Sequence, residues 1–345
     1  MADVEFAGLD FERHALQEVL RNELGPAGRF SVQRISGGQS NPTYFVDWGA
    51  ERLVLRKQPN GPILRGAHAI DREYRVLKAL SGTSVPVAEP LLFHEDPGAL
   101  GTPFYLMQRV EGRVLDDAAL GSVPREHRRA IWMAVADAMA KMHAVLPADV
   151  GLSDYGKPGN YFARQINRWS RQYEASGTGR IPELDHLCQW LPDNTPEDDG
   201  LVRLAHGDFR IGNMLFHPEK PEVVAILDWE LSTLGHPMAD LGFCCMPWHT
   251  APDEYGGIFG LDVSGSGLPQ ERDFIARYQS QVTFPAQLLP FHKAFALFRF
   301  AVIFVGISDR AKAGSAADPR AAELGPLAQR FAIRALEIID GKHGS

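Results

Sequence analysis

The chain has 345 residues, of which 45% are hydrophobic and 23% are charged. This composition is that of a globular protein, and it excludes a disordered chain, a collagen-like fibre and a small disulfide scaffold. The length suits two lobes of ordinary domain size, about 100–250 residues each. The net charge of −8 argues against a nucleic-acid partner, because phosphate backbones are bound by clustered lysines and arginines.

Apolar spacing in the first third predicts a mostly antiparallel sheet with two helices. Residues 10–24 form an amphipathic pattern that ends at a Gly-Pro pair, and residues 69–80 form a second one. Strand-like runs occupy residues 30–35, 43–48, 52–57, 88–95 and 103–110.

The pattern becomes mainly helical after residue 112. Helices are predicted at residues 125–146 and 160–176, and most of the chain beyond residue 238 is helical. Short strands are predicted at residues 201–206, 214–217 and 223–229. We therefore predict an α+β protein with a small β-rich lobe over residues 1–110 and a larger helical lobe over residues 111–345.

The cysteines and the apolar segments bear on location. Cys188, Cys244 and Cys245 cannot form a paired disulfide framework, which predicts a reducing, cytoplasmic compartment. The first residues show no signal peptide. The most apolar run, residues 294–307, is shorter than the roughly 20 residues of a membrane-spanning helix. We expect a buried core helix and no membrane partner, with Arg299 inside it needing either an acidic core residue or an anionic ligand.

The segment HGDFRIGN at residues 206–213 carries the strongest chemical signal. Asp208 and Asn213 follow a predicted strand, and Asp228 comes fifteen residues after Asn213, at the end of the strand pattern VVAILDW. Side-chain oxygens of this kind are ligands that Mg²⁺ prefers. The spacing is typical of a kinase catalytic loop followed by its metal-binding aspartate. Taken singly, each residue could equally be a turn or capping residue.

Two features of the first lobe are consistent with a nucleotide site. A glycine-rich loop between two predicted strands could bring backbone N–H groups to phosphates, although a plain hairpin turn is the alternative. Its candidate residues are Gly37, Gly38, Ser40 and Asn41. The third strand ends in Arg56-Lys57, and alternation sends only one of these cations into the cleft. Glu73, on the second predicted helix, is the candidate partner for that cation or else a surface charge.

These motifs together resemble the aminoglycoside phosphotransferase family, also called choline-kinase-like small-molecule kinases. The pattern H-G-D-x-x-x-x-N, followed by L-D-W-E and by GHPMADL at residues 235–241, is similar to that of the family. The resemblance implies a two-lobed, protein-kinase-like fold that uses ATP and Mg²⁺. It implies Asp208 as the catalytic base and His206 as support for its loop, with Asn213 and Asp228 as metal ligands.

The same resemblance suggests further roles in the first lobe and in the loop that follows Asp228. It selects Arg56 over Lys57 as the phosphate-binding cation, and it implies a hinge around Gln108 and Val110 that binds adenine. Asp240 would brace the catalytic loop.

A narrower resemblance concerns the acceptor. The runs VLRKQP, HAIDREYRVLKAL and AILDWELSTLGHPMADLGF are similar to the kinase-like domain associated with acyl-CoA dehydrogenases. This resemblance implies a small-molecule acceptor with a hydroxyl group, such as a hydroxyacyl-CoA or a hydroxy acid. Arginines in the predicted helices favour a neutral or anionic acceptor, with solvated helix faces as the alternative: Arg125, Arg128, Arg129, Arg164, Arg168 and Arg171. Candidate wall residues of the acceptor site are Tyr161, Arg164, Trp169, Trp248, His249 and Tyr255.

Other functions compete with this prediction. An aminoglycoside-type antibiotic phosphotransferase would use the same chemistry on a polycationic acceptor. A kinase-like module could also bind nucleotide without turnover, although the complete set of Asp208, Asn213 and Asp228 argues against this. A protein kinase is disfavoured, since the chain has no D-F-G or A-P-E motif.

Overall fold

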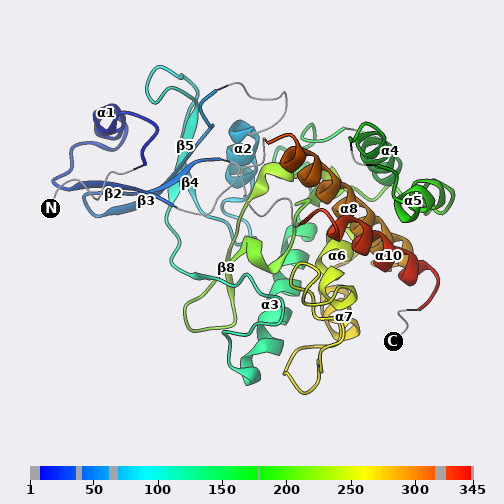
Figure 1. The fold of residues 1–345 in the computed structure, drawn as a ribbon. Helices are drawn as coiled ribbons and strands as arrows, with labels where there is room; N and C mark the ends of the chain where they lie inside the picture. Colours follow the sequence, from blue (N-terminus) through cyan, green and yellow to red (C-terminus); the bar gives the residue numbers. More distant parts are fainter. Residues whose placement is uncertain are drawn as a thin grey trace. The chain divides into compact units, whose positions relative to one another are not determined.

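The structure is a computed structural model that describes residues 8–35, 41–61, 69–157, 159–177, 179–314 and 324–342. The chain divides into two compact units, and Figure 1 labels most of their larger elements. Unit 1 comprises Met1–Gly112 and Val224–Glu230, and unit 2 comprises Arg113–Val223 and Leu231–Ser345. The predicted lobes did not include Val224–Glu230 in the first unit, because a contact between distant parts of the chain leaves no local pattern. The assignment of nucleotide binding to the first lobe and acceptor binding to the second stays a prediction.

Unit 1 contains an antiparallel sheet with the strand order β1-β2-β3-β5-β4. Its strands are β1 (Phe30–Arg34), β2 (Thr43–Trp48), β3 (Glu51–Lys57), β4 (Pro90–His94) and β5 (Phe104–Gln108). Its helices are α1 (Arg13–Leu24) and α2 (Ile70–Leu80). The predicted elements of this region are present, with ends that shift by a few residues, as is usual where helices and strands fray.

Strand alternation builds the core of unit 1. In β2, Tyr44, Val46 and Trp48 are buried, and in β3 Leu53 and Leu55 are buried on the same face of the sheet. These residues form one apolar cluster with two α1 leucines and with Phe104 and Leu106 of β5. The other face of β3 is therefore left for polar chemistry.

Unit 2 is mainly helical. Its α-helices are α3 (Arg125–Ala144), α4 (Tyr161–Glu174), α5 (Pro182–Asp193), α6 (Met238–Cys244), α7 (Glu271–Gln279), α8 (Pro290–Lys312) and α10 (Leu327–Ile339). Its short strands pair antiparallel: β7 (Arg203–Ala205) with β10 (Thr233–Gly235), and β6 (Arg113–Val114) with β8 (Met214–Phe216). The described residues also form three short 3₁₀ helices, labelled η. η1 (Ile211–Asn213) and η3 (Met246–His249) belong to unit 2. β9 (Val223–Ile226) and η2 (Trp229–Leu231) include the chain positions where one unit ends and the other begins.

Sequence patterns missed α5, β6 and β10. The two strands span only two or three residues, too few to show an alternation. The strand predicted over residues 223–229 ends at Ile226, because Asp228 has a left-handed backbone with φ of 63°.

Helix α8 is the centre of unit 2 and packs against α4, α5, α6 and α10. It has 23 residues and is therefore longer than the apolar run at residues 294–307. By length and composition alone, the helix could cross a membrane. Within its most apolar window, however, 78% is buried inside the fold, as in the core helix of a globular protein. The predicted core role of its phenylalanines is confirmed, since Phe295, Phe298, Phe300 and Phe304 are all buried.

Candidate active site

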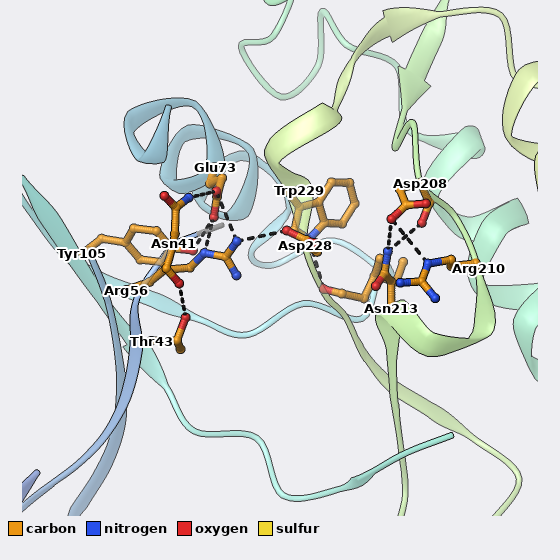
Figure 2. Close-up of polar contacts among 11 residues, drawn as sticks. Asn41, Thr43, Arg56, Glu73, Tyr105, Asp208, Arg210, Asn213, Asp228 and Trp229 are labelled. Carbon is orange, nitrogen blue, oxygen red and sulfur yellow. Dashed lines mark hydrogen bonds and ion pairs between the residues drawn. The ribbon is translucent and has the colours of Figure 1, made fainter. Parts of the chain in front are cut away.

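Arg56 lies on the face of the sheet opposite the core of unit 1. Its Nε atom is 2.9 Å from Glu73 Oε2, and its Nη2 atom is 3.0 Å from Asp228 Oδ1 (Figure 2). The Arg56 Nε–H bond is not aligned for a hydrogen bond, so the contact between Nε and Glu73 Oε2 is an ion pair. Burial works against the charge on Arg56, but the neighbouring carboxylates outweigh it and raise the pKa of the guanidinium. Arg56 therefore stays a cation.

Lys57 points the opposite way and is fully buried. Its Nζ atom is 3.1 Å from Asp10 Oδ2 and 3.0 Å from Asn60 Oδ1. The two adjacent cations thus serve different faces of the sheet, as strand alternation requires. The pairing predicted for Glu73 is made by Arg56.

Glu73, on α2, collects the polar groups around Arg56. Its carboxylate accepts hydrogen bonds from Asn41 Nδ2 at 2.7 Å and from the Tyr105 hydroxyl at 3.0 Å (Figure 2). Burial raises the pKa of Glu73 above its ordinary value, although Arg56 and the two hydrogen bonds oppose the shift. The side chain of Asn41, a candidate residue of the phosphate-binding loop, donates a hydrogen bond to Glu73 in this structure.

Asp228 completes this group in unit 1. It lies in Val224–Glu230, the second chain segment of that unit, and its side chain is 32% exposed. Its φ of 63° lies in the left-handed region, which aspartate enters more readily than most residues. Among the residues described, Oδ2 has no hydrogen bond, so one carboxylate oxygen remains available beside Arg56.

The catalytic-loop motif lies in unit 2, where Asp240 holds its backbone. The Asp240 carboxylate accepts hydrogen bonds from the backbone N–H groups of His206 at 2.7 Å and Gly207 at 2.9 Å. Burial would raise the pKa of Asp240, but hydrogen bonding and charge from His143, together with the backbone donors, lower it overall. The carboxylate is therefore a stable anion that fixes the start of the loop.

Gly207 is required at its position for two reasons. Its φ is 82°, a conformation that other residues rarely adopt. A Cβ atom there would lie 2.7 Å from the carbonyl oxygen of Leu231. His206 is fully buried, and its Nδ1 accepts the backbone N–H of Asp208 at 3.2 Å, which places it as a support of the loop.

Asn213 orients Asp208. Its Nδ2 donates to Asp208 Oδ2 at 2.6 Å and to the Asp208 carbonyl at 2.9 Å, as Figure 2 shows. The Arg210 Nε atom lies 3.4 Å from the same carboxylate. The Asp208 side chain is 23% exposed, so it is fixed in direction and still accessible to a substrate.

The side-chain oxygen atoms of Asn213 and of Asp228 are each of the chemical kind that Mg²⁺ binds. Because both amide protons of Asn213 face Asp208, its carbonyl oxygen Oδ1 is left without a hydrogen bond from the described residues. Asp228 likewise offers Oδ2. Hard oxygen donors of this kind suit Mg²⁺, which also takes ligands from nucleotide phosphates and water. Asn213 belongs to unit 2, and Asp228 belongs to unit 1.

The remaining predicted nucleotide residues are only partly described. Gly37, Gly38 and Ser40 lie outside the described residues. At the end of β5, the N–H of Gln108 donates to the Glu89 carbonyl at 2.8 Å, and the N–H of Arg109 donates to the Arg52 carbonyl at 2.9 Å. The backbone of Val110 makes no hydrogen bond among the described residues, so it could receive a base.

Sequence reasoning missed Tyr105 and Arg210. The β3–β5 register places Tyr105 directly opposite Arg56, a relation visible only once the strand order is known. Arg210 lies within the catalytic motif itself, where no rule gave it a role. Arg299, which was expected to meet an acidic core residue or an anionic ligand, donates among the described residues to the backbone carbonyl of Gly207.

Unit 2 contains a cavity of about 770 Å³, within the range of ligand pockets. Of the predicted acceptor wall, Tyr161 and Arg164 line it, whereas Trp169, Trp248, His249 and Tyr255 do not. Its charged lining residues are Asp154, Lys157, Arg164, Glu197, Asp198 and Asp199.

The arginines predicted to favour an anionic acceptor are partly structural. Arg128 donates to the carbonyls of Val123 and Ser266, and Arg129 forms an ion pair with Asp273. Their charge is therefore used in the packing of α3.

Comparison with known proteins identifies the family. Residues 31–275 match the profile of the APH group, described as the phosphotransferase enzyme family. The chain belongs to this family. The resemblance stated from the motifs is thereby confirmed, and so is the protein-kinase-like α+β fold.

Curated relatives of this phosphotransferase are longer proteins. Acyl-CoA dehydrogenase family member 10 of Mus musculus is 38% identical over 324 residues, which are 92% of this chain and 30% of that protein. Acyl-CoA dehydrogenase family member 11 of Gallus gallus is 39% identical over 320 residues, which are 91% of this chain and 41% of that protein. The chain thus spans less than half the length of these relatives.

Solved structures show the same fold. A Ralstonia eutropha JMP134 protein assigned to the aminoglycoside phosphotransferases is 42% identical, with a TM-score of 0.86 over 96% of this chain and 98% of that one. The aminoglycoside phosphotransferase APH(4)-Ia, in a ternary complex with AMP-PNP and hygromycin B, is 15% identical, with a TM-score of 0.61 over 96% of this chain and 99% of that one. This second likeness concerns the fold alone.

Proposed function

We propose that this phosphotransferase moves the γ-phosphoryl group of ATP to a hydroxyl group of a small molecule, with a hydroxyacyl-CoA or a hydroxy acid as acceptor. The observation that carries the proposal is the Asp208 carboxylate, held by Asn213 at 2.6 Å and still partly exposed. A base fixed in this way can accept a proton from a bound hydroxyl. The acyl-CoA acceptor is suggested by the relatives named for acyl-CoA dehydrogenases.

Each side chain has a defined task in this mechanism. Asp208 aligns the acceptor hydroxyl and takes its proton as the new O–P bond forms. The bond between the γ-phosphorus and the β–γ bridging oxygen breaks, and ADP leaves with that oxygen. Arg56 binds phosphate oxygens of the nucleotide, and Glu73 keeps its guanidinium in place.

Asn213 and Asp228 would hold Mg²⁺ through the oxygen atoms described above. The ion would supply positive charge that offsets the negative charge of the transferring phosphoryl group. The adenine base would bind at the hinge near Gln108 and Val110, where the N–H of Val110 makes no hydrogen bond to the part of the chain that the structure describes.

The test is acceptor-dependent ADP release by the purified protein with ATP and Mg²⁺, assayed against a panel of hydroxyacyl-CoA esters and free hydroxy acids. Mass spectrometry of the product should show one added phosphoryl group. Asp208→Asn should abolish transfer while ATP affinity, measured by calorimetry, stays within about threefold. Absence of transfer to every member of the panel would reject the proposed acceptor class.

The charge of the unit 2 cavity favours a second candidate. Its lining carries the carboxylates of Asp154, Glu197, Asp198 and Asp199 against the cations of Lys157 and Arg164. An excess of carboxylates suits a polycationic acceptor such as an aminoglycoside. Expression in a sensitive bacterium separates the candidates, because only an aminoglycoside kinase raises the inhibitory concentration of the drug.

A further inference from the structure

Arg299 is a buried cation without an acidic partner among the described residues. It lies in α8, and only 7% of its surface is exposed. Its guanidinium carbon is 5.6 Å from the ring centre of Trp169 and 5.4 Å from that of Phe243. A buried charge needs hydrogen bonds or a counter-charge to offset its loss of hydration. The faces of the two aromatic rings offset part of this loss of hydration. The hydrogen bond that Arg299 donates must offset much of the rest.

That hydrogen bond goes to the catalytic loop. Arg299 Nη2 donates to the backbone carbonyl of Gly207. This carbonyl belongs to the peptide group that joins Gly207 to Asp208, so its direction sets the rotation of the Asp208 backbone. On the other side of Gly207, the backbone N–H is held by Asp240 at 2.9 Å. The residue before the candidate base is thus fixed through both its N–H and its C=O groups.

Glycine at position 207 makes such a fixation necessary. Gly207 has no side chain to restrict its backbone, and it is held at φ of 82°. Without a partner for its carbonyl, the peptide plane could rotate about its neighbouring bonds. The Asp208 carboxylate would then move away from the direction that Asn213 gives it.

We propose that Arg299 is a positioning residue for phosphoryl transfer, which holds the Gly207–Asp208 peptide so that Asp208 faces the acceptor hydroxyl. The assignment rests on the proposed function, in which Asp208 is the base. Direct contact with a ligand is disfavoured, because so little of the Arg299 surface is exposed. Tyr161, whose pKa burial raises to about 12, is neutral and supplies no counter-charge.

Three variants of the full chain test the assignment. Arg299→Met removes the donor and keeps an unbranched side chain, while Arg299→Lys keeps a cation that can reach the carbonyl in part. Phe304→Leu is the matched control, since Phe304 lies in the same helix but packs on Tyr255, Phe300 and Phe331. For each we would measure the melting temperature, hydrogen–deuterium exchange of the peptide covering residues 205–213, and kcat and KM for ATP.

Arg299→Met should raise the exchange rate of the 205–213 peptide about tenfold, while Phe304→Leu leaves it unchanged despite a lower melting temperature. It should lower kcat on the order of 100-fold with KM for ATP changed less than about threefold, because a misplaced base affects the transition state and not nucleotide binding. Arg299→Lys should recover part of both losses.

Equal exchange in Arg299→Met and the wild type, or an equal increase in Phe304→Leu, would overturn the assignment. So would a kcat that follows the melting temperature across all three variants. If the wild type transfers phosphate to no acceptor, the proposed function fails, and the exchange measurement alone decides whether Arg299 holds the loop.

Discussion

Removal of the Glu73 carboxylate tests the polar group around Arg56 most directly. Glu73 is 1% exposed and contacts Arg56, Asn41 and Tyr105. Glu73→Ala would leave a buried guanidinium without its nearest counter-ion and would remove the carboxylate that accepts hydrogen bonds from Asn41 and Tyr105. Breaking a buried pair in this way costs about 3–5 kcal/mol. Because Arg56 keeps its contact with Asp228, we expect a value near the lower limit.

This loss of unfolding free energy can be converted into a shift of the melting temperature. About 1 kcal/mol corresponds to about 4 °C for a domain the size of unit 1, between about 100 and 150 residues, so Glu73→Ala should lower the melting temperature by about 12 °C. Differential scanning calorimetry measures the shift. Glu111→Ala is the matched control, since its ion pair with Arg52 is more than half exposed and contributes about 1 kcal/mol or less. Equal shifts in the two variants would refute the reasoning.

The same group makes a prediction about binding. Glu73→Gln removes the charge but keeps a side chain of the same shape, so it should destabilise less than Glu73→Ala. If Glu73 holds Arg56 for the nucleotide, both variants should weaken ATP binding, as measured by calorimetry. Unchanged affinity in both would show that Arg56 does not need Glu73 to bind phosphate.

Three further predictions concern unit 2. Gly207→Ala should abolish transfer and destabilise the fold by about 1–3 kcal/mol, because of its left-handed backbone and the contact with the Leu231 carbonyl; an active, stable variant in urea unfolding would contradict this. Asp240→Asn should lower kcat more than it raises KM for ATP, since it weakens the acceptor for the His206 and Gly207 N–H groups; steady-state kinetics measure the split. Stability should fall as pH decreases below 6.5, because burial lowers the pKa of His292 to about 3 and only the unfolded chain then binds that proton. The loss is about 1 kcal/mol between pH 6.5 and 5.5, and His292→Gln should remove it in melting curves recorded against pH.

Several parts of this protein could be predicted from the sequence because they depend on local pattern. Apolar patterns are a property of neighbouring residues. Alternation located the strands of unit 1, and the continuous apolar run at residues 294–307 assigned the α8 phenylalanines to the core. The spacing of Asp208, Asn213 and Asp228 is also local, and it led to the phosphotransferase family that comparison confirms.

Other parts depend on contacts between distant residues, which no single segment contains. Strand alternation alone left Arg56 and Lys57 as alternatives, and the packing of α2 and the segment around Asp10 decided which carboxylate each one meets. Arg299 was recognisable as a charge in an apolar helix, yet its partner lies 92 residues away in the backbone of the catalytic loop. The chemistry expected of the site could be predicted from the sequence, because it depends on residue types and spacing. The groups that hold the candidate catalytic residues in place are visible only in the fold, because hydrogen bonds and ion pairs form between whichever side chains the fold brings within reach.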